Sequence, residues 1–204
     1  MHNLSLFVIA TLLLAITPGQ DFIYVMLRSI SQGAWAGIIA IMGLMVGVTF
    51  HTIAAATGVA AILLTSSAAF TVIKLGGAVY LVYLGIQSFR QKGHLKINQP
   101  REKANKLKLF KEGIISSTLN PKLALFFMAF LPQFVDPGDD TFIQMLLLGL
   151  LFALISLPVL ISVALISSHM GKIIISNHKI AQSIGKVTGL MLIGLGIRLA
   201  LVER

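Results

Sequence analysis

Two short polar interruptions, each built around a proline, divide otherwise apolar stretches of the chain: Thr17-Pro18-Gly19-Gln20-Asp21 and Asn120-Pro121-Lys122. A Thr or Asn side-chain oxygen caps the free N–H groups at the start of a helix, and proline suits the first helical turn because it lacks an N–H. The pattern predicts that one helix ends and another begins at each interruption. The two new helices would then start opposite each other, with their N–H groups and positive dipole ends available to the carboxylate of a small solute.

Composition places these helices in a membrane. The 204 residues are 56% hydrophobic and only 11% charged, with a mean hydropathy of +0.91, which is too apolar for a soluble domain. The apolar stretches run for about 20 residues without the alternation of outer-membrane strands, so they predict spanning helices. The predicted fold is an all-α integral membrane protein with about six transmembrane helices, the first and fourth broken at proline. The predicted spans are 3–27, 35–64, 68–89, 113–135, 141–168 and 184–202.

The net charge of +9 is concentrated between the third and fourth predicted spans. The positive-inside rule favours a cytoplasmic loop that touches anionic lipid over a nucleic-acid interface. The acidic loop 136–140 and both termini are expected on the other side. The basic residues of this connection, about 90–112, are Arg90, Lys92, Lys96, Arg101, Lys103, Lys106, Lys108 and Lys111.

The order of the interruptions predicts an internal repeat within one transmembrane domain, residues 1–204. The first repeat covers about 1–90 and the second about 113–204. Three spans per half is an odd number, so the second repeat would enter the membrane from the opposite side. The start of the chain carries no Lys or Arg, and its apolar run continues past the first interruption, which favours a spanning helix over a cleaved signal peptide.

Three of the ionisable residues within the predicted spans are candidates for function, and each has two interpretations. Asp21 either complements the dipole of the new helix or binds an ammonium group or a proton. Lys122 either pairs with Asp21 or extends to the cytoplasmic surface. His51 either shuttles protons and bonds the solute or simply packs. Other polar, aromatic or helix-bending residues could line a substrate pathway, although the aromatic ones also suit the membrane interface or packing. They are Gln20, Tyr24, Asn120, Tyr80, Tyr83 and Pro158, with weaker candidates at Gln144, Ser156 and Ser162.

Motifs for catalysis are absent from the sequence. It contains no nucleophile elbow, no clustered His and carboxylate ligands for a metal, and no phosphate-binding Gly-rich loop. Because there is no cysteine, disulfides and thiolate metal sites are excluded. We therefore expect no enzyme activity and no cofactor, and an ion gradient as the source of energy for uphill movement.

Four motifs, in order along nearly the whole chain, resemble the LysE/RhtB family of amino-acid exporters. They are Thr17-Pro18-Gly19-Gln20-Asp21-Phe22-Ile23-Tyr24-Val25, Arg28-Ser29-Ile30-Ser31-Gln32-Gly33, Lys74-Leu75-Gly76-Gly77-Ala78-Val79-Tyr80-Leu81-Val82-Tyr83-Leu84-Gly85, and Leu119-Asn120-Pro121-Lys122 with Phe130-Leu131-Pro132-Gln133-Phe134. One departure is Gln20, where many members have proline. The resemblance implies a bacterial inner-membrane transporter that exports threonine, homoserine, leucine or lysine types of amino acid against protons.

The two interruptions and the resemblance together give an amino-acid efflux transporter as the first hypothesis. A passive channel or a membrane scaffold, in which the breaks only shape a pore or an interface, is the alternative. Expected partners are a small amino acid and membrane lipid, with a homo-oligomer left open because glycine-rich spans pack within or between subunits. The predicted proton-coupling residues are Asp21 and His51. The predicted substrate-binding residues are Thr17, Pro18, Gly19, Gln20, Asp21, Asn120, Pro121 and Lys122.

Overall fold

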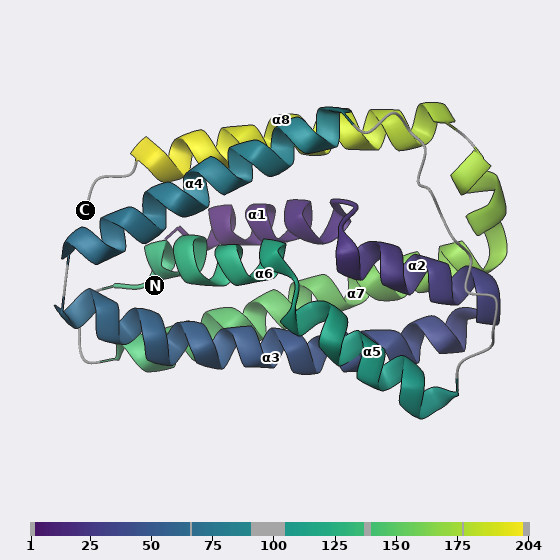
Figure 1. Cartoon of the computed structure of the whole chain (residues 1–204), viewed down its shortest axis with the longest axis horizontal. Helices are drawn as coiled ribbons and strands as arrows, with labels where there is room; N and C mark the ends of the chain where they lie inside the picture. The colour runs from purple at the N-terminus through teal and green to yellow at the C-terminus, as the bar shows by residue number, and fades with distance from the viewer. Residues whose placement is uncertain (1–2, 66, 91–104, 137–139, 177, 202–204) are drawn as a thin grey trace.

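The computed structural model describes residues 3–65, 67–90, 105–136, 140–176 and 178–201, and none of these residues forms a strand. The described elements are all helical (Figure 1). In chain order they are α1 (Leu4–Ile16), α2 (Gln20–Gln32), α3 (Ala34–Thr65), α4 (Ser67–Arg90), α5 (Lys106–Thr118), α6 (Pro121–Leu125), the π-helical turn η1 (Phe126–Phe130), the 3-10 turn η2 (Leu131–Phe134), α7 (Thr141–Ser176) and α8 (His178–Leu201).

Two to four segments of the described chain have the length and composition of a membrane span. The apolar parts of α3 and α7, Ala34–Gly58 and Thr141–His169, qualify as single helices. The α1–α2 pair and the segment from α5 through η2 qualify if each bent pair counts as one span, with bends of 49° and 44°. The apolar stretch within α4, Leu75–Gln87, is shorter.

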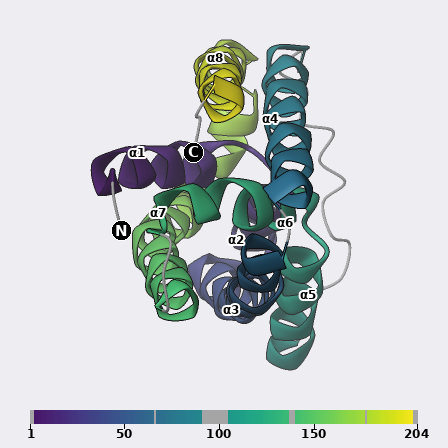
Figure 2. The same cartoon turned by 90° about the vertical axis from the view of Figure 1, so that its left-hand side faces the viewer.

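The helices form three layers that are visible from two directions (Figures 1 and 2). The α4–α8 pair lies on one side, and α3, α5 and α7 lie on the other. The interrupted segments α1–α2 and α6 run between them (Figures 1 and 2), and Thr17 and Asn120 are buried while Gln20 and Pro121 remain exposed. The α2–α3 connection, the end of α7 and the start of α5 lie at one end of the molecule, while the end of α3 and the starts of α4 and α7 lie at the other (Figure 1).

Three pairs of helical segments, each with one member from either side of the basic connection, run in opposite directions (Figure 1). In Figure 1 the α1–α2 segment runs against α5–α6, α3 against α7, and α4 against α8. The α4–α8 pair is in direct backbone contact, since a Cβ atom on Gly85 would lie 2.6 Å from the carbonyl oxygen of Gly189, and the converse distance is the same. Only glycine at both positions allows this approach.

Aromatic side chains fill the core beside the second interruption. The rings of Phe7 and Phe134 meet edge to face at 5.2 Å, and those of Phe126 and Phe130 lie 4.9 Å apart. All four side chains are buried, and Phe152 of α7 joins them at 5.4 Å from Phe126. This cluster packs α1 and α7 against η1 and holds the segment after α6 in place.

Two predicted boundaries were wrong. α5 begins at Lys106, inside the connection predicted to extend to about 112, because Asn105 caps it by accepting a hydrogen bond from the Lys108 N–H at 2.8 Å. α8 begins at His178 rather than at 184. Helices extend beyond their apolar stretches where the polar residues that precede them still favour helix. The remainder of the basic connection, residues 91–104, lies outside the described residues.

Candidate functional site

At the first interruption, the start of α2 has no side-chain cap. α1 ends at Ile16, and the Thr17 hydroxyl donates to the carbonyl of Leu13 in the preceding turn. The residue before α2 is Gly19, and the first backbone bond of α2 joins the Ile23 N–H to the Gly19 carbonyl at 2.9 Å. The predicted capping role of Thr17 is therefore wrong, because its hydroxyl bonds backward along its own helix. The first N–H groups of α2 have no partner within the helix.

The second interruption is capped by its own residue. The Oδ1 atom of Asn120 accepts the N–H of Lys122 at 3.0 Å, and Pro121 occupies the first helical position. The Asn120 N–H in turn donates to the Ser117 carbonyl at 3.0 Å. Asn120 is only 2% exposed, and its Nδ2 atom makes no hydrogen bond of good geometry, although its side-chain amide interacts with the Asp21 carboxylate. This buried amide can therefore donate either to Asp21 or to a ligand.

The side chain of Lys122 crosses from the second interruption to the first. Its ammonium group donates to the carbonyl oxygens of Leu14 at 3.0 Å and Thr17 at 3.1 Å. These carbonyls lie at the C-terminal end of α1, where helical partners run out and the dipole is negative. The ammonium does not extend toward the basic connection, so the surface interpretation of Lys122 is wrong.

Asp21 lies in the first turn of α2 and faces α5. Its Oδ1 atom accepts the hydroxyl of Ser116 at 3.1 Å. The opposite charges of Asp21 and Lys122 attract each other, and both residues line the same small cavity. The structure thus brings the two predicted ionisable residues together at the interruptions, with the carboxylate bonded to α5 and the ammonium bonded to α1.

Two cavities meet at the interruptions. The larger has a volume of about 230 Å³, and seven of the eight predicted binding residues line it, the exception being Asp21. The smaller, of about 40 Å³, contains Asp21 together with the buried Ser156 of α7. Asn120 and Lys122 line both. By volume, the larger cavity has room for a small amino acid and the smaller for roughly three water molecules.

His51 lies in the middle of α3 and is almost fully buried. Its Nε2 atom is 2.9 Å from the carbonyl of Ser117, which accepts the hydrogen bond, so this nitrogen carries the proton. The ring also packs against Phe127, with centroids 6.0 Å apart. His51 lines neither cavity but lies close enough to Asp21 to affect its charge.

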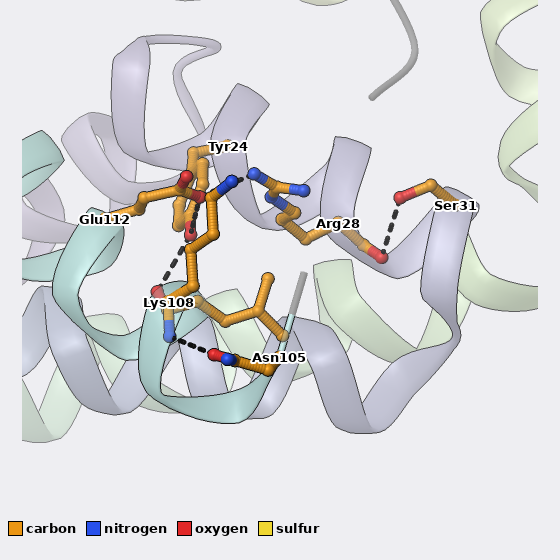
Figure 3. Close-up of polar contacts among 7 residues, drawn as sticks. Tyr24, Arg28, Ser31, Asn105, Lys108 and Glu112 are labelled. Carbon is orange, nitrogen blue, oxygen red and sulfur yellow. Dashed lines mark hydrogen bonds and ion pairs between the residues drawn. The ribbon is translucent and has the colours of Figure 1, made fainter. Parts of the chain in front are cut away.

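A polar cluster joins α2 to α5 between the interruptions and one end of the molecule (Figure 3). Arg28 and Glu112 form an ion pair at 2.5 Å, and the Tyr24 hydroxyl donates to the Leu109 carbonyl at 2.8 Å and to Glu112 at 3.2 Å. The sequence analysis missed Glu112 and Ser116. Glu112 had a detectable signal, since it is the only acidic residue between Glu102 and Asp136.

The remaining candidates divide between the cavities and the exterior. Tyr80 lines the larger cavity, as does Gln87, which the sequence analysis missed. Tyr83 is exposed and packs against Tyr80, and Pro158 lies within α7 without ending it. Gln144 and Ser162 make other hydrogen bonds, to the backbone of Asp136 and Pro158. No group of three or more His, Asp or Glu side chains in the described part of the chain could hold a metal ion.

Comparison with known proteins assigns the chain to a family. A family model described as LysE type translocator matches residues 12–203. The chain belongs to this family. The family is one of membrane transport proteins, and the resemblance of the four sequence motifs is thereby confirmed.

Relatives within the family include both uncharacterised and named proteins. The chain is 30% identical to the uncharacterized membrane protein YrhP of Bacillus subtilis, covering 98% of this chain and 100% of that protein. It is 30% identical to an uncharacterized membrane protein of Vibrio cholerae, over 98% and 97% of the two chains. It is 28% identical to the homoserine/homoserine lactone efflux protein of Salmonella typhimurium, over 95% and 94%. No solved structure matches the chain.

Proposed function

We propose that this protein is a secondary transporter that exports amino acids or close derivatives across the bacterial inner membrane, driven by protons. The substrates would be of the threonine, homoserine, leucine or lysine type, in line with relatives named for homoserine and homoserine lactone efflux. The observation that carries the proposal is the larger cavity, in which residues of both interruptions, one from each half of the chain, surround a space for a small amino acid.

In this proposal each bent pair is one broken span, and α4 and α8 complete six spans in two inverted repeats. The opposite directions of the corresponding segments support this arrangement (Figure 1). The end that carries Arg28, Lys106, Lys108 and Lys111 would face the cytoplasm by the positive-inside rule. Both halves contribute to the cavity, so a rocking motion of one against the other would expose it to each side in turn.

The chemistry of the two cavities suits a zwitterion. The uncapped start of α2 offers N–H groups and a positive dipole end to the substrate carboxylate, with the Asn120 amide as a further donor. Asp21 receives the substrate ammonium group or the coupling proton, assisted by nearby His51. The substrate fills the larger cavity with its side chain, next to Tyr80 and Gln87.

Counterflow in proteoliposomes tests this function. Vesicles containing the purified protein are loaded with unlabelled homoserine and diluted into labelled homoserine, with a panel of other amino acids as competitors. We expect transient accumulation of label, because a carrier exchanges substrate across the membrane, and uphill transport that a protonophore abolishes. A passive channel would equilibrate the label without any overshoot and would overturn the proposal.

A further inference from the structure

The Lys122 ammonium occupies a position with the chemistry of a cation site. It lies between two backbone carbonyl oxygens at the C-terminal end of α1, at 3.0 and 3.1 Å, and lines one cavity with the Asp21 carboxylate. In transporters with interrupted helices, carbonyls at the ends of half-helices are typical ligands of a coupling sodium ion. Here a tethered ammonium bonds to them.

Gly19 provides an independent observation for the same site. A Cβ atom at this position would lie 2.9 Å from the Lys122 Nζ atom and 3.2 Å from its Cε atom. The backbone of Gly19 is extended, with φ −148° and ψ −173°, a conformation that any residue adopts. A side chain at position 19 would therefore displace the end of the Lys122 side chain, whereas the conformation of the chain itself does not call for glycine.

We propose that Lys122 acts as a built-in cation that fills, on the carbonyls of Leu14 and Thr17, a site that would otherwise take sodium. The side chain belongs to the second half of the protein and its ligands to the first, so the bond joins the halves without any ion from solution. Transport by this protein then needs no sodium. This role rests on the proposed transport function, but the presence of the site does not.

Lysine gives this arrangement two properties that a bound ion lacks. The ammonium cannot leave with the substrate, because it is covalently attached to α6. Its three donors exceed the two carbonyls, so one N–H remains for a third acceptor, such as the carboxylate of a bound amino acid. The lysine nitrogen therefore stays at the site whether or not substrate is present.

Replacing the lysine should expose the sodium site. In Lys122→Ala the carbonyls and Asp21 are left facing an enlarged cavity, and we expect sodium to bind there. The unfolding temperature of this variant should rise by about 2–4 °C in NaCl relative to choline chloride at equal ionic strength, the shift expected at about five times the Kd. The wild type and Lys111→Ala, which loses an exposed charge on α5, should show no such difference.

Two further variants separate an ion site from a simple helix cap. In Lys122→Met the methionine side chain fills the space of the lysine but has no hydrogen-bond donor. This variant should therefore have a lower unfolding temperature than the wild type, and sodium should not raise it. Gly19→Ala keeps the lysine but pushes its Nζ atom away from the carbonyls, and we expect a smaller rise in sodium. If Lys122→Ala does not fold, the sodium-dependent rise in the unfolding temperature of Gly19→Ala tests the proposal instead. A lack of any sodium response in the variants that fold would overturn the proposal and leave Lys122 as a cap for α1.

Transport assays provide the functional readout. Homoserine counterflow by the wild type should be equal in sodium and choline, while Lys122→Ala should lose most of its activity in choline and regain part of it in sodium. Sodium-dependent transport by the wild type would contradict the inference. If the wild type carries no amino acid while Lys122→Ala is still stabilised by sodium, the transport function fails and the ion site stands.

Discussion

The two interruptions look alike in sequence but satisfy their polar groups in different ways. At the second, Asn120 caps the new helix with its own side chain, and the Ser117 carbonyl before it receives both the Asn120 N–H and His51. At the first, the new helix has no side-chain cap, and the carbonyls before it receive the ammonium of Lys122 from the other half of the chain.

Under the proposed function, this difference makes the second interruption an anchor and the first a binding site. The second interruption caps its own new helix and is bonded to α3 through His51, so it can hold the backbone of Asn120 and Lys122 in a fixed position. The first leaves N–H groups at the start of α2 beside a cavity, which is the arrangement that favours an anion. The predictions below test this asymmetry in order of expected effect.

The largest effect is expected from Asp21→Asn at the first interruption. Asparagine keeps an oxygen that accepts the Ser116 hydroxyl, so the fold should persist, but it removes the charge. Proton-driven homoserine export in vesicles should fall by about tenfold or more, equal to about 1.4 kcal/mol. Asp140→Asn, at the start of α7, is the matched control. Undiminished export by the Asp21 variant would remove this carboxylate from the mechanism.

The next effect concerns the caps themselves. Asn120→Ala should reduce the free energy of unfolding by about 1 kcal/mol through loss of the cap, whereas Thr17→Val should cost less, because the Thr17 hydroxyl bonds within its own turn. Thermal unfolding in detergent measures both. Asn120→Asp keeps a capping oxygen but loses the Nδ2 donor, so it should retain stability and lose transport. If Asn120→Ala and Thr17→Val lowered the free energy of unfolding by the same amount, the proposed difference between the two interruptions would be contradicted.

His51→Gln tests whether the link between α3 and α5 also serves the proton. Glutamine can still donate to the Ser117 carbonyl but does not titrate. We expect export driven by an imposed proton gradient to fall by about threefold, or about 0.7 kcal/mol, while counterflow without a gradient persists. Unchanged gradient-driven export would leave His51 as a packing residue. Thermal unfolding serves as the control for structure.

The smallest effect is expected where α2 and α5 meet beyond the interruptions. Glu112→Gln removes the ion pair with Arg28 but keeps an oxygen for Tyr24 (Figure 3). Because the pair is only partly buried, the free energy of unfolding should fall by about 0.5 kcal/mol. High salt should reduce the difference from wild type. A loss of several kcal/mol would show that this cluster, and not the interruptions, holds the two halves together.

Much of the fold could be predicted because hydropathy reports directly on the membrane. Long apolar stretches gave the helices, and the two Pro motifs marked the places where α1 and α5 end. Helix ends were less predictable. The start of α5 at Lys106 depends on a single cap at Asn105 within a polar segment, where hydropathy carries no signal.

The candidate site was predictable in its members but not in its connections. The sequence by itself determined that Asp21, Asn120 and Lys122 lie at breaks in apolar helices, because polar residues next to proline have few other uses there. Only the tertiary structure decided that Lys122 caps α1, that Ser116 holds Asp21 and that the Asn120 amide lies beside the Asp21 carboxylate. Those partners are about 95 to 108 residues apart or belong to no local motif, so they depend on how the two halves pack and not on the order of residues along either one.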